Sequence, residues 1–475
     1  MDTTAEDFRR DCERVGRWIA DYLQSSERYP VLARTRPGDV RRALPPSAPV
    51  DPEPFEAVWR DFERVVLPGV THWNHPGFFA YFAITGSGPG VLGEMLSAAL
   101  NVNGMLWKTC PAATELEEVT LDWLRQMLGL PAMFGMILDT ASMATLGAMA
   151  AARESLDLDI RQRGLSGRAD VPRLRVYASE QAHSSVDKAA IVLGFGQEGL
   201  RKIPTDDAFR MRPDALADAI EQDLLNGWRP VCVVATVGTT STTSIDPVAA
   251  VADVCARHNL WLHVDAAYGG AAGIVPEMRA VLDGCDRADS FVVNPHKWLF
   301  VPVDCTAFYT RRPEILRRAF SLVPDYLRTF EDDVTNYMDY GIQLGRRFRA
   351  LKLWMVLRMF GVRALQEAIR RHVALAQTFA AWVDASEEFE RVAPVPFSTV
   401  CFRWRPGGVC DTEADRLNEA LMDAVNATGQ AYLSHTRLGG RFVLRLAVGH
   451  LRTEERHVAR CWALLREHAQ RLGLR

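Results

Sequence analysis

The sequence has almost no excess charge of either sign. Its 475 residues include 55 lysines and arginines and 59 aspartates and glutamates, which gives a formal net charge of −4 at pH 7. Proteins that hold nucleic acid or an anionic membrane through their overall field carry an excess of positive charge. The composition therefore argues against both kinds of partner. The arginine pairs Arg311-Arg312 and Arg346-Arg347 are interpreted as solvated surface.

Paired cysteines and long apolar runs are also missing. The nine cysteines stand singly, without a CxxC pair, and several of them, such as Cys232, lie inside apolar runs. This pattern indicates reduced, buried thiols rather than a disulfide framework, and it predicts no metal site. No apolar run approaches the roughly 20 residues of a membrane-spanning helix. The acidic first residues are unlike a signal peptide, so we expect a cytoplasmic protein.

Hydrophobic residues, in contrast, are plentiful. They make up 48% of the chain, which is enough for a large core, and no repeat or low-complexity tract interrupts them. The first helical pattern, over residues 7–26, places Trp18 and Tyr22 on one apolar stripe. Prolines and arginines follow in residues 36–49 and exclude a long helix there. We expect residues 1–85 to form a helical arm that packs on a second subunit.

Short apolar runs alternate with helical patterns in the middle of the chain. The predicted strands are residues 175–178, 231–236, 260–264, 290–293 and 306–309, with helices at 212–226 and 247–258. This alternation predicts an α/β domain with a mostly parallel sheet over residues 86–375. Beyond a helical stretch at 344–383, the predicted elements are strands at 397–404 and 441–447 and helices at 413–427 and 453–472. They indicate a small α+β domain over residues 376–475.

Polar side chains follow three of the predicted strands directly. Asp265 comes after residues 260–264, Lys297 comes shortly after 290–293, and the hydroxyl-rich loop 238–243 comes after 231–236. Ligands of open α/β sheets bind at the carboxyl ends of the strands, so we expect an acid, a lysine and hydroxyls to meet there. Residues 139–142 add hydroxyls at a predicted helix N-terminus, a natural cradle for phosphate.

Five motifs occur in order along the chain. They are Pro68–Trp73 (PGVTHW), Ala182–Val186 (AHSSV), His263–Tyr268 (HVDAAY), Asn294–Trp298 (NPHKW) and Leu344–Arg349 (LGRRFR). Together they resemble the group II decarboxylases that depend on pyridoxal phosphate (PLP), in particular aromatic L-amino acid decarboxylase, from the N-terminal helix to about residue 450. The resemblance implies the PLP-dependent transferase fold of type I, as in aspartate aminotransferase. It also implies a homodimer with active sites at the subunit interface.

The resemblance implies roles for the residues of these motifs. Lys297 would form the Schiff base with pyridoxal 5'-phosphate. Asp265 would pair with the pyridine nitrogen and keep it protonated, so that the ring remains an electron sink. His183 would stack on the ring, while Ala141 and Ser142 would hold the phosphate. The other implied cofactor contacts are Thr240, Ala267, Asn294 and His296.

The family also uses a loop tyrosine, which returns a proton to Cα after CO₂ has left. A gap-free match from Lys297 onward places this residue at Tyr326, within residues 322–327. One departure concerns the phosphate cradle, because Met143 stands where the family usually has a glutamate. Asp139 precedes the same helix, so the acid near the cradle has moved or been lost.

Substrate contacts are implied for residues 73–105. The expected contacts are Trp73, Tyr81, Phe82, Ile84, Thr85, Asn103 and Met105. The first three keep the aromatic lining that a flat apolar ring requires. The others depart from the family: Ile84 replaces a threonine, with Thr85 next to it. Asn103 and Met105 replace isoleucine and phenylalanine.

The sequence therefore predicts a PLP-dependent carboxy-lyase that converts an aromatic L-amino acid (tryptophan, tyrosine, DOPA or phenylalanine) into the arylalkylamine and CO₂. An alternative is an aldehyde synthase, which uses O₂ to turn the same substrates into aryl acetaldehydes. Such enzymes tend to lack the loop tyrosine or the stacking histidine, and both are present here as Tyr326 and His183. A PLP aminotransferase and a non-catalytic scaffold of the same fold are the remaining alternatives.

Overall fold

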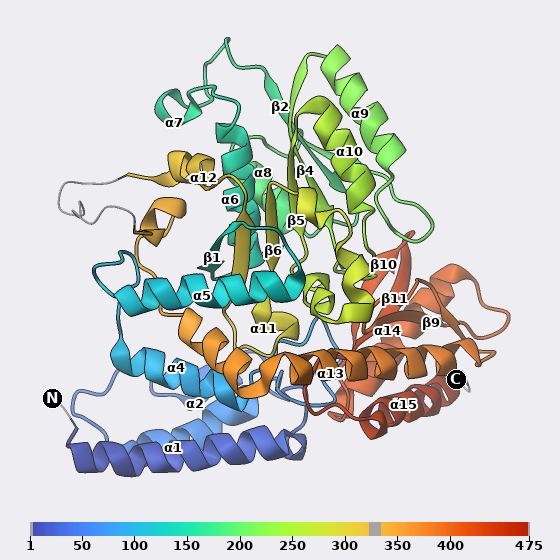
Figure 1. Ribbon diagram of the computed structural model, residues 1–475. Helices are drawn as coiled ribbons and strands as arrows, with labels where there is room; N and C mark the ends of the chain where they lie inside the picture. The colour runs from blue at the N-terminus through green and yellow to red at the C-terminus, as the bar shows by residue number, and fades with distance from the viewer. Residues whose placement is uncertain (1–2, 323–333, 474–475) are drawn as a thin grey trace. The chain divides into compact units, whose positions relative to one another are not determined.

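The computed structural model describes residues 3–322 and 334–473, which form two compact units (Figure 1). One unit comprises the chain up to Ala83 together with Thr378–Val392 and Phe402–Arg475. The other comprises Ile84–Gln377 and Ala393–Cys401 and is called here the sheet unit. The N-terminal and C-terminal segments thus group together. The three-part division at residues 85 and 375 stays a prediction.

A seven-stranded sheet forms the centre of the sheet unit. Its strands are β1 (Phe134–Leu138), β2 (Arg173–Ser179), β3 (Leu200–Ile203), β4 (Trp228–Thr236), β5 (Trp261–Asp265), β6 (Ser290–Val293) and β7 (Thr306–Thr310). They lie in the order β1-β7-β6-β5-β4-β2-β3. All the neighbours from β3 to β6 pair in parallel, whereas β7 is antiparallel to both β6 and β1. The predicted α/β fold with a mostly parallel sheet is confirmed.

Helices pack on this sheet through small or apolar side chains. The helix α6 (Ala141–Glu154) has every residue from Ala144 to Ala152 buried, since its alanines and Gly147 allow a close approach to the strands. Its neighbours are α8 (Ser185–Val192) and α12 (Pro313–Phe320). Further helices of the unit are α4 (Gly88–Leu100), α5 (Pro111–Leu128), α7 (Ile160–Arg163), α9 (Pro213–Leu225), α10 (Val248–His258) and α11 (Pro295–Trp298).

The predicted helix over residues 344–383 begins later and is bent. It is α13 (Ala350–Asp384), and it contains a kink at Gly361, whose φ of 69° and ψ of 165° are not helical. A positive φ costs glycine little because it has no Cβ, so the bend falls on this residue. The sequence pattern predicted the helix but not its break.

The unit that holds both termini contains α1 (Ala5–Ser25; Figure 1), whose N-cap Thr4 accepts the Asp7 N–H. Its other elements include α2 (Asp39–Ala43), α3 (Phe55–Asp61), α14 (Asp411–Ala427) and α15 (Glu455–Gly473). A four-stranded sheet has the order β10-β11-β9-β8, formed by Ser434–Leu438, Arg441–Ala447, Thr399–Trp404 and Phe389–Arg391. The pairs β10–β11 and β8–β9 are antiparallel.

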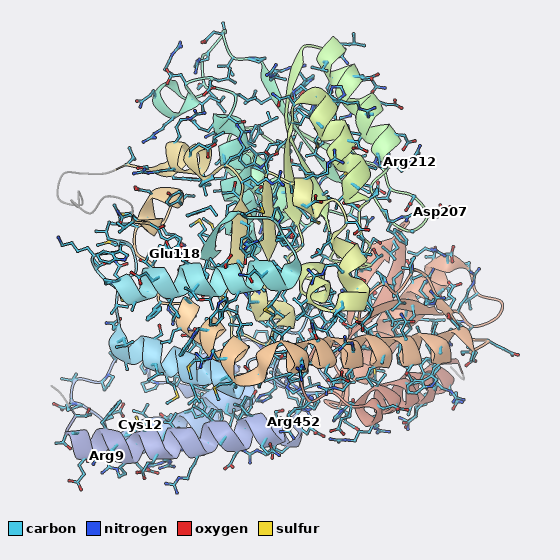
Figure 2. The ribbon with its side chains drawn as sticks, viewed as in Figure 1. Arg9, Cys12, Glu118, Asp207, Arg212 and Arg452 are labelled. Carbon is cyan, nitrogen blue, oxygen red and sulfur yellow. The ribbon has the colours of Figure 1, made fainter. Side chains whose placement is uncertain are left out.

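The apolar stripe of α1 is partly covered within its own unit. Trp18 packs edge-on against Trp59 and Phe62, with ring centroids 6.2 and 5.1 Å apart. Arg452 donates to the Leu23 carbonyl near the end of the helix (2.9 Å; Figure 2). Phe8, in contrast, is 62% exposed. The packing of this segment on a second subunit stays a prediction.

One interpretation of the sequence is wrong for Arg346. This residue is buried and pairs with the buried Glu117 at 2.7 Å, whereas the adjacent Arg347 is exposed as expected. The reason is tertiary, because Glu117 of α5 needs a positive partner inside the unit. No helix among residues 3–322 and 334–473 is long and apolar enough to cross a membrane.

Candidate active site

The carboxyl ends of the parallel strands and the start of β7 meet at one edge of the large sheet. The pairing register shows this directly, since Asp265 at the end of β5 lies opposite Thr236 of β4 and Val292 of β6. On the other side, Thr306 begins β7 opposite Leu138, the last residue of β1. The loops that carry the expected cofactor residues therefore leave the sheet at the same edge, as predicted.

Lys297 and Asp265 lie at this edge on neighbouring segments. Asp265 is buried, and its Oδ1 accepts the Ala267 N–H at 3.1 Å. Lys297 is in the short helix α11, and its N–H donates to the Asn294 carbonyl at 2.9 Å. Surrounding protein lowers the pKa of the Lys297 amine, while the negative charge of Asp265 acts in the opposite direction. The lowered pKa favours the neutral amine, the form that attacks a carbonyl carbon.

His183 lies in the loop between β2 and α8 and is exposed at the edge. Its Nδ1 accepts the Ser185 N–H (3.1 Å), which leaves the proton of the neutral ring on Nε2. Partial desolvation lowers the pKa of His183; Asp265 opposes that decrease and Lys297 adds to it. A neutral, flat ring is thus held beside the lysine and the acid.

The N-terminus of α6 offers backbone donors at the same edge. Ala141 and Ser142 are its first two residues, and N–H groups in the first turn of a helix have no acceptor within the helix. The N-cap Thr140 makes no side-chain capping bond among the described residues, so its hydroxyl does not accept from the N–H groups of this first turn. Such a terminus binds phosphate through its N–H groups and its dipole.

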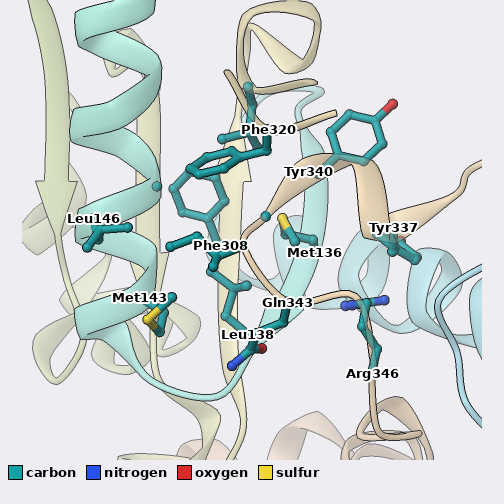
Figure 3. Close-up of a pocket in the computed structure, with 14 residues that line it drawn as sticks. Met136, Leu138, Met143, Leu146, Phe308, Phe320, Tyr337, Tyr340, Gln343 and Arg346 are labelled. Atoms are coloured by element: carbon teal, nitrogen blue, oxygen red, sulfur yellow. The ribbon is translucent and has the colours of Figure 1, made fainter. Parts of the chain in front are cut away.

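The acid next to this cradle is Asp139, as the sequence indicated. Its carboxylate accepts the Thr140 hydroxyl at 3.1 Å and a Gln343 N–H at 3.0 Å. Met143, the residue that replaces the family glutamate, instead lines an apolar pocket with Phe308 and Tyr337 (Figure 3). The substitution therefore places an apolar side chain in an apolar environment.

The start of the hydroxyl-rich loop after β4 is held by bonds from two backbone N–H groups. The Val237 N–H donates to the Asp265 carbonyl (2.9 Å), and the buried Asp246 accepts the Thr236 N–H (2.8 Å). Burial raises the pKa of Asp246 to about 6. Thr243 has a φ of 59°, a conformation that a β-branched residue rarely adopts. Thr240, the expected cofactor contact, is exposed in this loop.

Asn294 and His296 come shortly before Lys297 and are both buried. The Asn294 N–H donates to the carbonyl of Ala267, a buried residue in the loop after Asp265 (3.1 Å). His296 accepts the Cys305 N–H on Nδ1 at 2.9 Å, and its Nε2 lies 3.3 Å from the Asn294 amide. Thr306, which sequence reasoning did not single out, contacts the other end of that amide at 3.0 Å.

The seven expected substrate contacts divide between the two units. Trp73 and Tyr81 stack in the terminal unit with centroids 5.6 Å apart, and Tyr432 meets Tyr81 at 3.4 Å between hydroxyls. Phe82 lies in the same unit under the guanidinium of Arg445. Tyr432 was not predicted as part of this aromatic group, because it lies about 350 residues further along the chain.

The remaining four are in the sheet unit. Thr85 is buried and Ile84 is half-buried. Asn103 and Met105 lie in the loop after α4, where Asn103 Oδ1 accepts the Arg346 N–H at 2.9 Å. Met105 packs on Leu106 and Met338. Tyr326, the expected proton donor, lies outside the described residues.

Sequence reasoning did not assign a role to the residues beneath Asp265. His263 is two positions earlier on β5, and its Nδ1 lies 2.9 Å from the Ser290 hydroxyl, which also accepts the Trp261 indole N–H. Strand alternation could have indicated this, since residues 261, 263 and 265 share one face. Behind Lys297, Trp298 stacks on Tyr268 with centroids 4.8 Å apart.

These features fit pyridoxal 5'-phosphate. Lys297 would hold it covalently, Asp265 provides a carboxylate for the pyridine nitrogen, and the backbone N–H groups of Ala141 and Ser142 suit its phosphate. The described residues contain no group of three or more His, Cys, Asp or Glu side chains placed to hold a metal ion.

Comparison with known proteins agrees with this geometry. Residues 37–405 match the pyridoxal-dependent decarboxylase conserved domain. The chain is 43% identical to tyrosine decarboxylase 3 of Petroselinum crispum, over 98% of this chain and 92% of that one. It is also 43% identical to phenylacetaldehyde synthase of a Rosa hybrid cultivar, over 98% and 94% of the two chains.

A solved structure supports the same relationship along the whole chain. The crystal structure of Oryza sativa TDC with PLP and tryptamine matches with a TM-score of 0.95 and 42% identity, over 99% of both chains. The resemblance inferred from the five motifs is thus confirmed, and with it the fold of type I. The chain belongs to the pyridoxal-dependent decarboxylase family, and its cofactor is pyridoxal 5'-phosphate.

Proposed function

We propose that the protein removes the carboxyl group of an aromatic L-amino acid and releases the arylalkylamine and CO₂. The observation that carries this proposal is the meeting of Lys297, Asp265 and His183 at one sheet edge, with a lysine whose pKa is lowered. The substrate class rests on the relatives, which include tyrosine and tryptophan decarboxylases. Tryptophan, tyrosine, DOPA and phenylalanine make up the proposed class.

When bound, the cofactor ring supplies an electron sink for the bond that breaks at Cα. The residues of this chain hold and orient the reactants around it. Asp265 keeps a negative charge where the ring nitrogen must stay protonated. His183 presents its neutral ring beside the site, and Lys297 provides the amine that would hold the cofactor. The N-terminus of α6 anchors the phosphate of the cofactor, and Thr240 and Asn294 contribute to this binding.

Two further roles complete the proposal. We assign substrate contact to Trp73, Tyr81 and Phe82, because stacked aromatic rings suit a flat apolar side chain. We assign the return of a proton to Cα to Tyr326, on the basis of the sequence match from Lys297. A phenol held over Cα is suited to act as this general acid.

We also propose that the enzyme is a cytoplasmic homodimer with shared active sites. The support lies on α4, where four large apolar side chains are between 42% and 57% exposed: Leu92, Met95, Leu96 and Leu100. Their spacing of three and four residues places them on one side of the helix. An apolar stripe of this kind is usual at contacts between subunits.

An aldehyde synthase is the second candidate, favoured by the 43% identity to the Rosa phenylacetaldehyde synthase. One experiment separates the candidates: the purified protein is offered each of the twenty amino acids, and CO₂, amine, aldehyde and peroxide are measured together. We expect amine and CO₂ in equal amounts from aromatic substrates. Aldehyde and peroxide in place of amine would establish the synthase, and no product at all would indicate a scaffold.

A further inference from the structure

A chain of buried polar groups runs beside the catalytic lysine. It begins at the Cys305 N–H, passes through His296, Asn294 and Thr306, and ends at the Asp139 carbonyl, one residue before the N-cap of α6. His296 and Asn294 are 5% and 3% exposed, and Thr306 is fully buried. A mismatched donor in such a place costs the full desolvation penalty of the group, so the direction of every bond matters.

The direction is forced from the His296 end. A backbone N–H can only donate, so Nδ1 of His296, 2.9 Å from the Cys305 nitrogen, must accept. A neutral imidazole carries one proton, which is then on Nε2. Burial lowers the pKa of His296 to about 4, which keeps the ring neutral near pH 7. The structure places the Asn294 amide nitrogen 3.3 Å from Nε2, so two N–H groups face each other there. The amide satisfies His296 only when it is turned by 180°, so that its oxygen accepts the Nε2–H.

The opposite end leads independently to the same result. A backbone carbonyl can only accept a hydrogen bond. The Thr306 hydroxyl, 3.1 Å from the Asp139 carbonyl oxygen, therefore donates its one hydrogen to that oxygen. The structure places the Asn294 amide oxygen 3.0 Å from the same hydroxyl, which then has no hydrogen left for it. Turning the amide by 180° puts its nitrogen in this place, where it donates to the hydroxyl oxygen. Oxygen and nitrogen of a side-chain amide differ little in shape, so this orientation follows from the bonding partners.

We propose that His296 is a positioning residue that sets the orientation of the Asn294 amide through its Nε2–H. In this orientation the amide nitrogen lies toward Thr306 and the N-terminus of α6. An amide nitrogen carries two hydrogens, and Thr306 accepts one of them. The second is donated to the phosphate of the cofactor. His296 thus determines that Asn294 faces the phosphate with its amide nitrogen, a donor, rather than with its amide oxygen.

The test compares variants of His296 by cofactor affinity. His296→Gln keeps an acceptor for Cys305 and a donor for Asn294, whereas His296→Leu removes both. Each cofactor-stripped variant is titrated with PLP and with pyridoxal, which lacks the phosphate. We expect His296→Leu to weaken the binding of PLP about 10- to 100-fold, which is the contribution of one hydrogen bond to a charged group. Its affinity for pyridoxal should change less than about 2-fold, and His296→Gln should bind PLP close to the parent level.

Three results overturn the proposal. The first is an equal loss of affinity for PLP and for pyridoxal, and the second is an unchanged PLP affinity in His296→Leu. The third is a His296→Gln variant that binds PLP as weakly as His296→Leu does. Asn294→Ala should reproduce the PLP defect, and the double variant His296→Leu/Asn294→Ala should be no weaker than either single variant; additive losses contradict coupling. If the leucine variant does not fold, ¹⁵N-histidine NMR of the parent holoenzyme decides. The proposal requires the neutral Nε2–H form of His296 at pH 7, and an Nδ1–H form or an imidazolium overturns it.

Discussion

Single residues at the sheet edge owe their chemistry to the protein that surrounds them. Lys297 in water would be an ammonium ion, whereas burial lowers its pKa and favours the amine. His183 becomes a weaker base for the same reason, and the Ser185 N–H determines which ring nitrogen keeps the proton. Both effects act toward neutral groups next to the negative charge of Asp265.

Lys297→Ala should therefore abolish the covalent link to the cofactor and essentially all turnover, while the chain still folds. The visible absorption band of the purified protein measures the link, and CO₂ release measures turnover. Lys202→Ala is a suitable control, because Lys202 is a surface residue paired with Asp187. Decarboxylation by Lys297→Ala at a rate near that of the parent would remove the lysine from the mechanism.

Tyr326→Phe tests the proposed proton donor. The change removes only the hydroxyl, so the negative charge that develops at Cα when CO₂ leaves is no longer quenched quickly by a proton. Dissolved O₂ then competes: O₂ and water convert the substrate to aldehyde, CO₂, ammonia and hydrogen peroxide. We expect amine formation to fall by about 100-fold or more, with oxygen uptake in an electrode cell.

The same assay without oxygen is the control for this variant. Aldehyde and peroxide should disappear under nitrogen, whereas the slow residual amine should remain. If Tyr326→Phe forms amine at the parental rate and consumes no oxygen, another residue donates the proton. His183 is then the next candidate, since it is exposed at the same edge.

At the scale of elements, a buried ion pair connects α5, β1 and the segment before α13. Glu117 of α5 accepts the Ile137 N–H of β1 at 2.7 Å and pairs with Arg346 at 2.7 Å. Arg346 also donates to the Ile137 carbonyl at 2.8 Å and lies over the ring of Tyr337. These contacts hold β1, and hence the start of α6, against the rest of the unit.

Arg346→Met should lower the free energy of unfolding by about 3–5 kcal/mol, because it leaves the Glu117 carboxylate buried without a partner. The adjacent Arg347→Met is a matched control, since that exposed arginine pairs with Glu94 and should cost less than about 1 kcal/mol. Urea denaturation of the three proteins gives the comparison. Adding Glu117→Gln to Arg346→Met should recover part of the loss. Equal stability of the two single variants would contradict the assignment.

At the scale of the whole molecule, the proposed dimer has to cover the exposed stripe of α4. A helix does not usually present four large apolar side chains to water. Leu96, which is 51% exposed, lies near the middle of this stripe. A second copy of the chain is the partner that the family resemblance implies.

Leu96→Arg should consequently shift the protein from dimer to monomer and reduce its activity, because a charge in an apolar contact loses its hydration without gaining a partner. Sedimentation velocity over a range of concentrations measures the shift. Leu225→Arg is the control: Leu225 is 88% exposed on α9 and should leave the dimer unchanged. A Leu96→Arg dimer as tight as the parent would place the subunit contact elsewhere.

The sequence by itself determined the strands that lead to the site and the identity of its main residues. Strands such as β6 and β11 coincide with the predicted ranges, since a run of buried apolar residues is a local property of the chain. Lys297 and Asp265 were found for a similar reason. Asp265 ends the strand β5 and Lys297 lies in the short helix after β6, and parallel strands bring their carboxyl ends together.

Only the tertiary structure decided what surrounds a side chain. Arg346 has the appearance of a surface residue in sequence, and its burial depends on Glu117, more than 200 residues away. Tyr432 joins Tyr81 by the same kind of distant contact. The direction of the bonds through His296 and Asn294 likewise depends on two backbone groups that no local pattern brings together. Burial and hydrogen-bond partners are properties of the folded neighbourhood, so they become definite only when the chain has closed on itself.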